Sequence, residues 1–483
     1  PAEETIAPDS QDLTLAYYPD RSMNPLYGSD YTNRVVMSLM YQGLFAVDSK
    51  NNTTPILCSQ YQVTPDNRTW TIYLEPNATF SDGTRVTVQD VVASYEQARQ
   101  NVYYKGRFTH IARVELSSDG GVDFFLDTPY QNLALLLDIP IVKASEVTVD
   151  NPLGTGPYSL EDGIGGKHLQ RVVNWWCSSD DLVAKDSSIA LVEAESPSQI
   201  RDEFEFSGLS VVCTNPQTDS YADYRCDFEL WEVDSGFMMY IGCNVTYSKF
   251  FDDGTLRTFL TYGIDRQTLV DDNYGGLALP TTLPISPMSP YYSKSLATNY
   301  DYDEMRFIDA ASKFRVPTND KGVPRTLQLL VNSDDSARLR CARNIAATLT
   351  ELGLACETVE SPTSVYEARL QAANYDIYLG ITKLPTTADL SEFYRPWGEM
   401  SWGGLANETI YNMVNQSLAD RGNYYNLHKL VADDGRIIPV MAGYYAIYAK
   451  RGVLSDLNPA RDNVFYYTLG KTMESSKVAT QFS

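Results

Sequence analysis

The residues that most resemble a site for chemistry are "NPLGTGPYSL", 151–160, in which two glycines surround a threonine. A phosphate-binding loop needs a lysine and a serine or threonine at fixed spacing, so that backbone N–H groups and an ammonium surround the phosphates. Here Gly156 is followed by Pro157, which has no N–H to donate. The nearby "GIGGKH" has a lysine with no hydroxyl residue after it. The glycines therefore do not predict a phosphate site, and the stretch remains to be explained.

Residues for catalysis or metal binding are scarce. The chain has three histidines, His110, His168 and His428, and their wide separation does not predict a multi-histidine metal site. It has no G-x-S-x-G elbow, H-E-x-x-H motif, Walker motif or dinucleotide-binding glycine motif. A Ser–His–Asp triad is assembled by the fold, so a cleft hydrolase stays open as a lesser alternative. We expect no catalytic residue, no metal ligand set and no cofactor.

The cysteines are odd in number and lack the C-x-x-C spacing of zinc or redox sites. Cys213 and Cys226 flank a polar loop and could pair, whereas buried free thiols are the alternative. Cys341 and Cys356 are not expected to bridge, because the helix expected between them carries the chain onward. The seven are Cys58, Cys177, Cys213, Cys226, Cys243, Cys341 and Cys356.

Length and charge limit the class of protein. The chain has 483 residues, which predicts two to four domains, and a net charge of −24, which argues against nucleic acid and anionic lipid as partners. The chain contains no run of about 18 apolar residues, so the sequence predicts no membrane span. The polar opening "PAEETIAPDS" is interpreted as a tether. The 34 tyrosines are typical of recognition surfaces, or reflect a tyrosine-rich source.

The first 150 residues alternate short strands with helices, as in an α/β or α+β lobe. Val35, Val36, Leu39 and Met40 recur at helical spacing before Gly43, the expected helix stop. A second helix opens on a threonine and an aspartate at capping-box spacing. The expected strands are 12–19, 69–76 and 120–128, and the expected helices are 32–45 and 86–99.

The second half repeats this alternation and predicts a βαβ unit in a second α/β lobe. Asp253 is expected to cap one helix, and Asp265 to begin another that ends at Gly275 and Gly276. The expected strands are 237–245, 326–332, 375–381 and 437–450, and a longer helix is expected over 333–353.

Six phrases in order resemble one family. They are "NPL" at 24–26, "VVMSLMYQGLF" at 35–45, the region 59–96 with "FSDG", "LGTGPYSL" at 153–160, "LRTFLTYGIDRQTLV" at 256–270, and "YDIYLGI" followed by "DLSEFY" at 389–394. The chain resembles the family 5 extracellular solute-binding proteins of ABC transporters, which take up oligopeptides, dipeptides and nickel.

The resemblance implies an α/β, two-lobed periplasmic-binding-protein-like fold of type II (Venus-flytrap), with an extra subdomain in lobe 1. The implied parts are 1–35 and 151–235 of lobe 1, 36–150 as the extra subdomain, 236–440 as lobe 2, and 441–483 as the C-terminal return to lobe 1. A small ligand would sit between lobes that close around it. "GTGPY" becomes the turn where the subdomain rejoins lobe 1, with Gly154 and Gly156 adopting unusual φ values.

The resemblance also implies the ligand, the partners and the location of the protein. The expected ligand is a short peptide, and the expected partners are the permease subunits of an importer. The protein is expected to be a monomer, either lipid-anchored outside a Gram-positive cell or periplasmic.

A carboxylate pairs with the terminal ammonium in peptide receptors of this type, and Asp389 stands at the matching turn. The alternative is that Asp389 caps a helix or lies in a solvated loop. Leu390 replaces the proline of the family's pattern there. Arg395 is the candidate for a ligand carboxylate, with an ordinary surface arginine as the alternative. Trp397 and Trp402 are candidates for stacking on the ligand, or for packing on their own lobe.

Tyr17, Tyr18 and Asn24 lie where the loop after the first strand would reach the ligand, with core packing as the alternative. Trp175 and Trp176 are assigned to packing. Other functions stay open: a receptor for nickel or a metal chelate in the same family, the cleft hydrolase, and a relative with no ligand.

Overall fold

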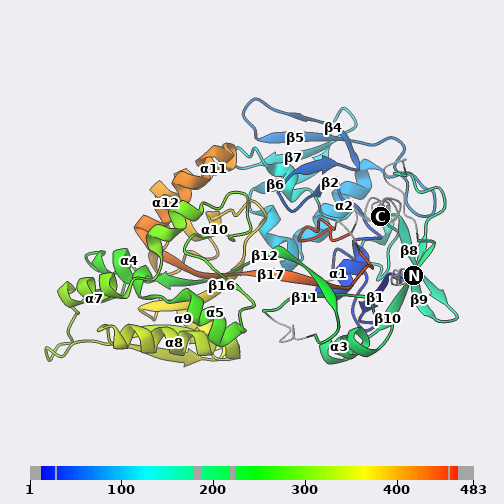
Figure 1. Ribbon diagram of the computed structural model, residues 1–483. Helices are drawn as coiled ribbons and strands as arrows, with labels where there is room; N and C mark the ends of the chain where they lie inside the picture. Colours follow the sequence, from blue (N-terminus) through cyan, green and yellow to red (C-terminus); the bar gives the residue numbers. More distant parts are fainter. Residues whose placement is uncertain (1–11, 28–29, 179–185, 218–223, 455–456, 466–483) are drawn as a thin grey trace, which may run out of the picture. The chain divides into compact units, whose positions relative to one another are not determined.

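The computed structural model describes residues 12–27, 30–178, 186–217, 224–454 and 457–465 (Figure 1). The polar opening, 1–10, lies outside this part of the chain. Contacts divide the protein into two compact units. Unit 1 takes in the residues up to Thr128, Leu133–Val233, and those from Tyr445 onward, and unit 2 consists of Pro129–Asn132 and Asp234–Tyr444.

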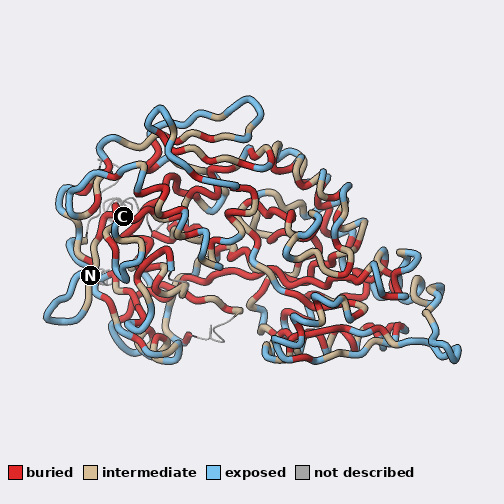
Figure 2. Tube along the Cα trace, turned by 180° about the vertical axis from the view of Figure 1, so that it is seen from behind, coloured by how far each residue is buried: buried red, intermediate tan, exposed pale blue. Residues whose placement is uncertain are grey.

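Two long strands carry the chain from one unit to the other. β12 (Phe228–Cys243) crosses at 233/234 and β17 (Ile437–Lys450) at 444/445, where the sequence analysis expected 235/236 and 440/441. Thirteen of the 14 residues of β17 are buried. Figure 2 colours the buried residues along the chain red. The contact division keeps 36–128 and 133–150 inside unit 1, so a separate subdomain there stays a prediction.

Unit 1 contains a mixed sheet in the order β17-β11-β1-β10-β9-β8. The strand predicted over 12–19 is β1, and it pairs in parallel with β10 and β11. Helix α1 packs on β1 and β11, and α3 also packs on β11. The elements are β1 (Thr14–Tyr17), β8 (Tyr158–Gly163), β9 (Gly166–Arg171), β10 (Ser188–Glu193), β11 (Val211–Thr214), α1 (Tyr31–Met37) and α3 (Pro197–Phe206).

A second, four-stranded antiparallel sheet in unit 1 has the order β4-β5-β7-β6 and packs against α2. The predicted capping box at the start of α2 is confirmed, since Thr87 and Asp90 each bond to the other's backbone N–H. The elements are β2 (Phe45–Val47), β3 (Thr53–Pro55), β4 (Cys58–Val63), β5 (Thr69–Leu74), β6 (Ile111–Leu116), β7 (Val122–Leu126), α2 (Val88–Arg99), η1 (Val102–Phe108), η2 (Leu133–Leu136) and η3 (Ala144–Glu146).

Helix α1 is shorter than predicted, because it ends at Met37 and not at Gly43. Ser38 is the C-cap, and its hydroxyl donates to the Val35 carbonyl, a local bond that competes with continuing the helix. Gly43 serves close packing, since a Cβ there would lie 2.7 Å from the backbone of Asp138.

The glycines of "GTGPY" also have a different role from the predicted one. Neither Gly154 nor Gly156 has a positive φ. A Cβ on Gly154 would lie 2.2 Å from the Met40 carbonyl oxygen, and one on Gly156 would lie 2.5 Å from the Met40 carbonyl carbon. The Gly156 N–H donates to that carbonyl at 2.9 Å. The glycines of the 151–160 stretch therefore allow it to pack closely against the segment after α1.

Unit 2 contains a sheet in the order β15-β14-β16-β12-β17, with β13 also paired to β17. Its strands are β13 (Leu279–Pro280), β14 (Leu327–Asn332), β15 (Cys356–Ser361) and β16 (Ile377–Lys383), together with parts of β12 and β17. Its helices are α4 (Thr255–Phe259), α5 (Arg266–Tyr274), α6 (Lys294–Ala297), α7 (Glu304–Lys313), α8 (Ser336–Glu351), α9 (Thr363–Gln371), α10 (Ser391–Tyr394), α11 (Glu408–Ala419) and α12 (Tyr424–Asp434), with η4 (Lys249–Phe251), η5 (Leu260–Gly263), η6 (Thr298–Tyr300), η7 (Trp402–Gly404) and η8 (Arg421–Asn423).

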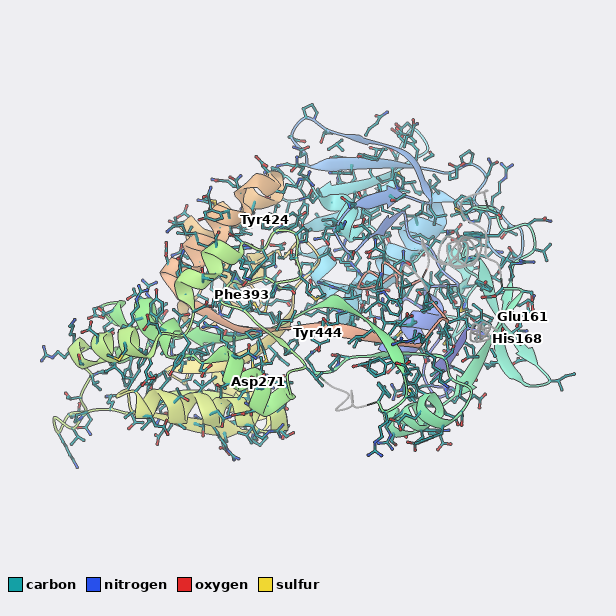
Figure 3. All side chains as sticks on the ribbon, in the orientation of Figure 1. Glu161, His168, Asp271, Phe393, Tyr424 and Tyr444 are labelled. Carbon is teal, nitrogen blue, oxygen red and sulfur yellow. The ribbon has the colours of Figure 1, made fainter. Side chains whose placement is uncertain are left out.

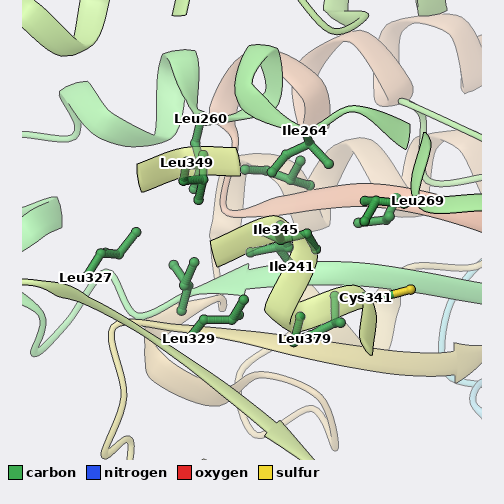
Figure 4. Close-up of a cluster of buried hydrophobic side chains, with 14 of the residues drawn as sticks. Ile241, Leu260, Ile264, Leu269, Leu327, Leu329, Cys341, Ile345, Leu349 and Leu379 are labelled. Carbon is green, nitrogen blue, oxygen red and sulfur yellow. The ribbon is translucent and has the colours of Figure 1, made fainter. Parts of the chain in front are cut away.

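The core of unit 2 joins its sheet to α4, α5, α7 and α8 (Figure 4). Ile345 and Leu349 of α8 and Leu329 of β14 are at most 2% exposed. The βαβ unit is confirmed, because β14 pairs in parallel with β16 and also with β15, an edge strand that the sequence analysis missed.

The local signals in unit 2 are mostly confirmed. Asp265 caps α5, and Gly275 ends it in the left-handed region. The exception is α4, whose N-cap is Gly254 at φ 71°, while Asp253 accepts a bond from the Thr255 N–H. Cys213 and Cys226 are both free thiols, so they do not pair.

Candidate ligand-binding surfaces

In open α/β sheets, ligands bind at the edge where parallel strands end. In unit 1 this edge is formed by the ends of β1, β10 and β11, where Tyr17 lies level with Glu193. The Tyr17 hydroxyl donates to the Glu193 carboxylate at 2.6 Å, and its ring is 1% exposed. Burial raises the pKa of Tyr17 well above its ordinary value, and Glu193 raises it further. Tyr17 therefore stays a neutral hydrogen-bond donor at this edge.

Tyr18 continues from the end of β1 and is held by its backbone. Its N–H donates to the Asn33 side chain at 2.7 Å, and its carbonyl accepts from the same side chain at 3.0 Å. The Arg21 guanidinium lies 3.7 Å from the centre of the Tyr18 ring, a cation–π contact. The structure thus gives Tyr18 an internal partner, and its contact with a ligand stays a prediction.

Asn24 is 1% exposed, and its side-chain amide forms hydrogen bonds to the backbone of other segments. Its nitrogen donates to the carbonyls of Val147 and Val149 at 3.0 and 2.6 Å, and its oxygen accepts from Leu26 N–H at 2.9 Å. These bonds fasten two distant segments of unit 1 together. They explain the residue without a ligand, and its predicted ligand contact is untested.

In unit 2 the corresponding edge is formed by the ends of β14, β15 and β16. The loops after β14 and β15 are tied together by Thr363, whose N–H and hydroxyl both donate to Asp334, at 2.8 and 2.7 Å. Thr363 also accepts from the Asn332 amide at 3.0 Å. This edge of the unit 2 sheet is therefore polar, and hydrogen bonds hold its two loops together.

Asp389 lies on the segment between β16 and α10 and is 8% exposed. One carboxylate oxygen accepts from the Ser391 N–H at 2.8 Å and from the Ser391 hydroxyl at 2.6 Å. These bonds fix the carboxylate at the start of α10. A buried carboxylate held in this way has the chemistry to pair with an ammonium group.

Tyrosines surround this segment. The Tyr130 and Thr387 hydroxyls lie 2.7 Å apart, and the Tyr424 hydroxyl donates to the Thr387 carbonyl at 2.5 Å. Figure 3 labels Tyr424 on α12 and Phe393 on α10. Burial is the main cause that raises the pKa of Tyr130 and of Tyr424, and the Asp389 charge adds to both shifts. Sequence analysis missed Tyr130, because it contacts residues more than 250 positions away.

The remaining three candidates lie on or beside the loop after α10. Arg395 is paired with Glu392 at 2.5 Å. Trp402 packs edge-to-face on Tyr378, with ring centres 5.9 Å apart. Trp397 is 98% exposed and has a φ of 61°, unusual for a bulky side chain. Of these three side chains, that of Trp397 is the most exposed to solvent.

A cavity of about 40 Å³ in unit 1 is lined by Arg34, Gln42 and Asp462, among others. Its volume corresponds to about three water molecules. Arg107 lies 2.7 Å from Asp462 and 3.1 Å from Asp138, so the buried charges nearby are compensated within the protein. This cavity is a place for water rather than for a peptide.

Metal-binding chemistry is sparse in the part of the chain that the structure describes, where no group of three or more His, Cys, Asp or Glu side chains could hold an ion. His110 pairs with Asp127 at 2.7 Å, and His428 is fully buried. Within the same described residues, no helix has the length and apolar character needed to cross a bilayer.

Three comparisons place this architecture among known proteins. The family model for the middle region of "bacterial extracellular solute-binding proteins, family 5" matches residues 52–404. The glutathione-binding protein GsiB of Escherichia coli is 24% identical in an alignment 302 positions long, which covers 58% of this chain and 57% of that protein. The match thus spans little more than half the length of this relative.

Solved structures share the fold over nearly the whole chain. An unliganded open form of the periplasmic murein tripeptide-binding protein MppA gives a TM-score of 0.78 at 15% identity, covering 94% of this chain and 96% of that one. NikA from Brucella suis, in complex with Fe(III)-EDTA, gives 0.71 at 17% identity, covering 94% and 99%. The fold is the predicted two-lobed type II α/β fold, and the chain belongs to the bacterial extracellular solute-binding proteins of family 5.

Proposed function

We propose that the protein is the ligand-capturing receptor of an ABC importer and that its ligand is a short peptide, which it hands to the permease unchanged. The observation that carries the proposal is the family match over residues 52–404. GsiB binds glutathione and MppA a murein tripeptide, so peptide-like ligands recur among the relatives. A lipid anchor outside the cell and a monomeric state fit this role.

Asp389 is the group we propose for the ligand's ammonium. Its carboxylate is buried and fixed by Ser391, which removes the entropic cost of ordering it on binding. The net charge of −24 favours approach of a cationic group. Trp397, exposed and held at a positive φ, is the proposed stacking surface.

Nickel bound to a small-molecule chelator is the second candidate, because NikA shares the fold and was solved with a metal chelate. The described residues offer no cluster of three metal-binding side chains, so the chelator would supply the ligands. A receptor for the chelate would then show little response to the ion alone.

A thermal-shift screen distinguishes the two. Peptides of two to five residues, free amino acids, nickel, and nickel with histidine are each added to the whole protein. A ligand at 100 times its Kd adds about 2.7 kcal/mol to the free energy of unfolding. We expect peptides to raise the Tm. A Tm raised only by nickel with histidine would overturn the peptide proposal in favour of the chelate.

The role of Asp389 is tested with Asp389→Asn, which keeps an oxygen acceptor for Ser391 and removes the charge. Asp253→Asn is the matched control, since Asp253 also accepts a backbone N–H near a helix start but is exposed. The first variant should lose the preference for peptides with a free amino terminus over N-acetylated ones. The control should keep it, and equal behaviour of the two variants would refute the role of Asp389.

A further inference from the structure

The turn that leads into Asp389 has a strained backbone. Residues 385–388 form this turn, which is closed by a hydrogen bond from the Ala388 N–H to the Pro385 carbonyl at 2.8 Å. Ala388 has a φ of 50°, in the left-handed region that residues with a Cβ avoid, and its side chain is packed in a hydrophobic cluster of unit 2. A conformation of this kind persists only where the surrounding structure holds it.

Thr387, the residue before the strained position, is held at two of its polar groups. Its side-chain hydroxyl lies 2.7 Å from the Tyr130 hydroxyl, and its backbone carbonyl accepts from the Tyr424 hydroxyl at 2.5 Å. Thr387 is fully buried, and both tyrosines are at most 2% exposed. Because solvent does not reach these groups, water cannot readily replace either bond when a hydroxyl is removed.

Each of the two tyrosines is itself anchored within unit 2. Tyr130 lies in a short segment that the contacts assign to this unit, and the next residue, Gln131, donates its N–H to the Leu418 carbonyl at 2.7 Å. Tyr424 is the first residue of α12, and its ring stacks on that of Tyr291, with ring centres 4.5 Å apart. Both hydroxyls are therefore presented from fixed positions.

The residue after the strained position carries the carboxylate. Asp389 is 8% exposed, and its carboxylate accepts from the N–H and the hydroxyl of Ser391. Burial is the main cause that raises the pKa of Tyr130 and of Tyr424, and the Asp389 charge adds to both shifts, so the carboxylate lies close to both rings. A movement of the turn would therefore redirect this carboxylate.

We propose that Tyr130 and Tyr424 are positioning residues for the ligand's ammonium group. They clamp Thr387 and thereby fix the direction of the Asp389 carboxylate. This inference rests on the proposed function and deepens it. Neither tyrosine has to touch the ligand. A carboxylate that is already held in one direction loses little freedom when the ammonium binds, and this is how the clamp contributes to affinity.

The test compares a pool of tripeptides with free termini with a pool of the same sequences N-acetylated. Isothermal titration into the whole protein gives an apparent Kd for each pool, and the ratio of the acetylated to the free value is the amino-terminal preference. Tyr130→Phe keeps the ring and removes the hydroxyl. We expect it to lower the preference by roughly three- to tenfold, the effect of one hydrogen bond. Thr387→Val removes the partner hydroxyl and should lower the preference by a similar factor.

Tyr366→Phe is the matched control, because the Tyr366 hydroxyl is also buried in unit 2 and donates to the Leu379 carbonyl at 3.0 Å. This control should keep the wild-type preference, even if its Tm falls as much as that of Tyr130→Phe. In the Asp389→Asn background, Tyr130→Phe should change the preference no further, because the tyrosine acts through the carboxylate. A further fall in that background would overturn the inference.

The inference and the function on which it rests fail in different ways. A wild-type preference that Asp389→Asn removes, but that Tyr130→Phe and Thr387→Val leave unchanged, would overturn the inference and keep the role of Asp389. A wild-type protein without the preference would overturn that role together with the inference. Binding of neither pool would overturn the proposed function itself. If one of the two clamp variants does not fold, the other decides.

Discussion

The burial of His428 in unit 2 can be tested by measuring how the free energy of unfolding depends on pH. The imidazole is fully buried on α12, and neither ring nitrogen has a hydrogen-bond partner. Burial lowers the pKa of His428 from 6.5 to about 3, because the charged ring would have no water around it. The folded protein therefore binds fewer protons here than the unfolded chain.

The sign and size of the effect follow from linkage. The stabilisation by the neutral ring is fully present above pH 6.5 and is lost as the pH falls from 6.5 toward 3. At pH 5, about 1.5 pH units below the unfolded pKa, the loss is about 2 kcal/mol, at 1.36 kcal/mol per unit. His428→Leu removes the titrating group and has no hydrogen bond to break.

The assay is urea unfolding of wild type and His428→Leu at pH 7.5 and pH 5.0. The wild-type protein should lose about 2 kcal/mol more than the variant between the two pH values. His168→Gln, on the two-stranded β8–β9 hairpin, is the control and should behave as wild type. An equal loss in wild type and His428→Leu, or an imidazole NMR signal of His428 that titrates near pH 6.5 in the folded protein, would refute the reasoning.

Three further outcomes are expected. Gly156→Ala should lower the free energy of unfolding, measured with urea, by about 3 kcal/mol, because the new Cβ would overlap the Met40 backbone. The control Gly165→Ala should change it by less than about 0.5 kcal/mol, because no atom lies within 4 Å of a Cβ at that position. Arg266→Lys should cost about 3 kcal/mol by urea unfolding, since a lysine cannot reach all of the acceptors that the guanidinium bonds. Trp397→Phe should leave the stability within about 0.5 kcal/mol and reduce the iodide quenching of the tryptophan fluorescence, and unchanged quenching would show that Trp397 is not exposed.

Local patterns predicted most of the elements in this protein. The capping box of α2 and the caps of α5 depend on neighbouring residues, and both were read correctly from spacing. β15 was missed because its residues are largely half-exposed or exposed at the sheet edge, which leaves little apolar pattern. The role of Gly156 depends on Met40, more than 100 residues away, so no local rule could identify it.

The candidate site was less accessible to sequence analysis. Asp389 was found only through its resemblance to a family turn, and its burial and its bonds to Ser391 come from the fold. The pairing of Tyr130 with Thr387 joins segments with no shared sequence signal.

The central claim is that the protein captures a peptide and returns it unchanged. Isothermal titration of a pool of tripeptides with free termini into the whole protein, followed by mass spectrometry of the recovered ligand, tests this most directly. We predict saturable binding of one peptide per protein molecule and recovery of intact peptide after denaturation. Recovery of hydrolysed fragments, or the absence of heat and of bound peptide, would contradict the account.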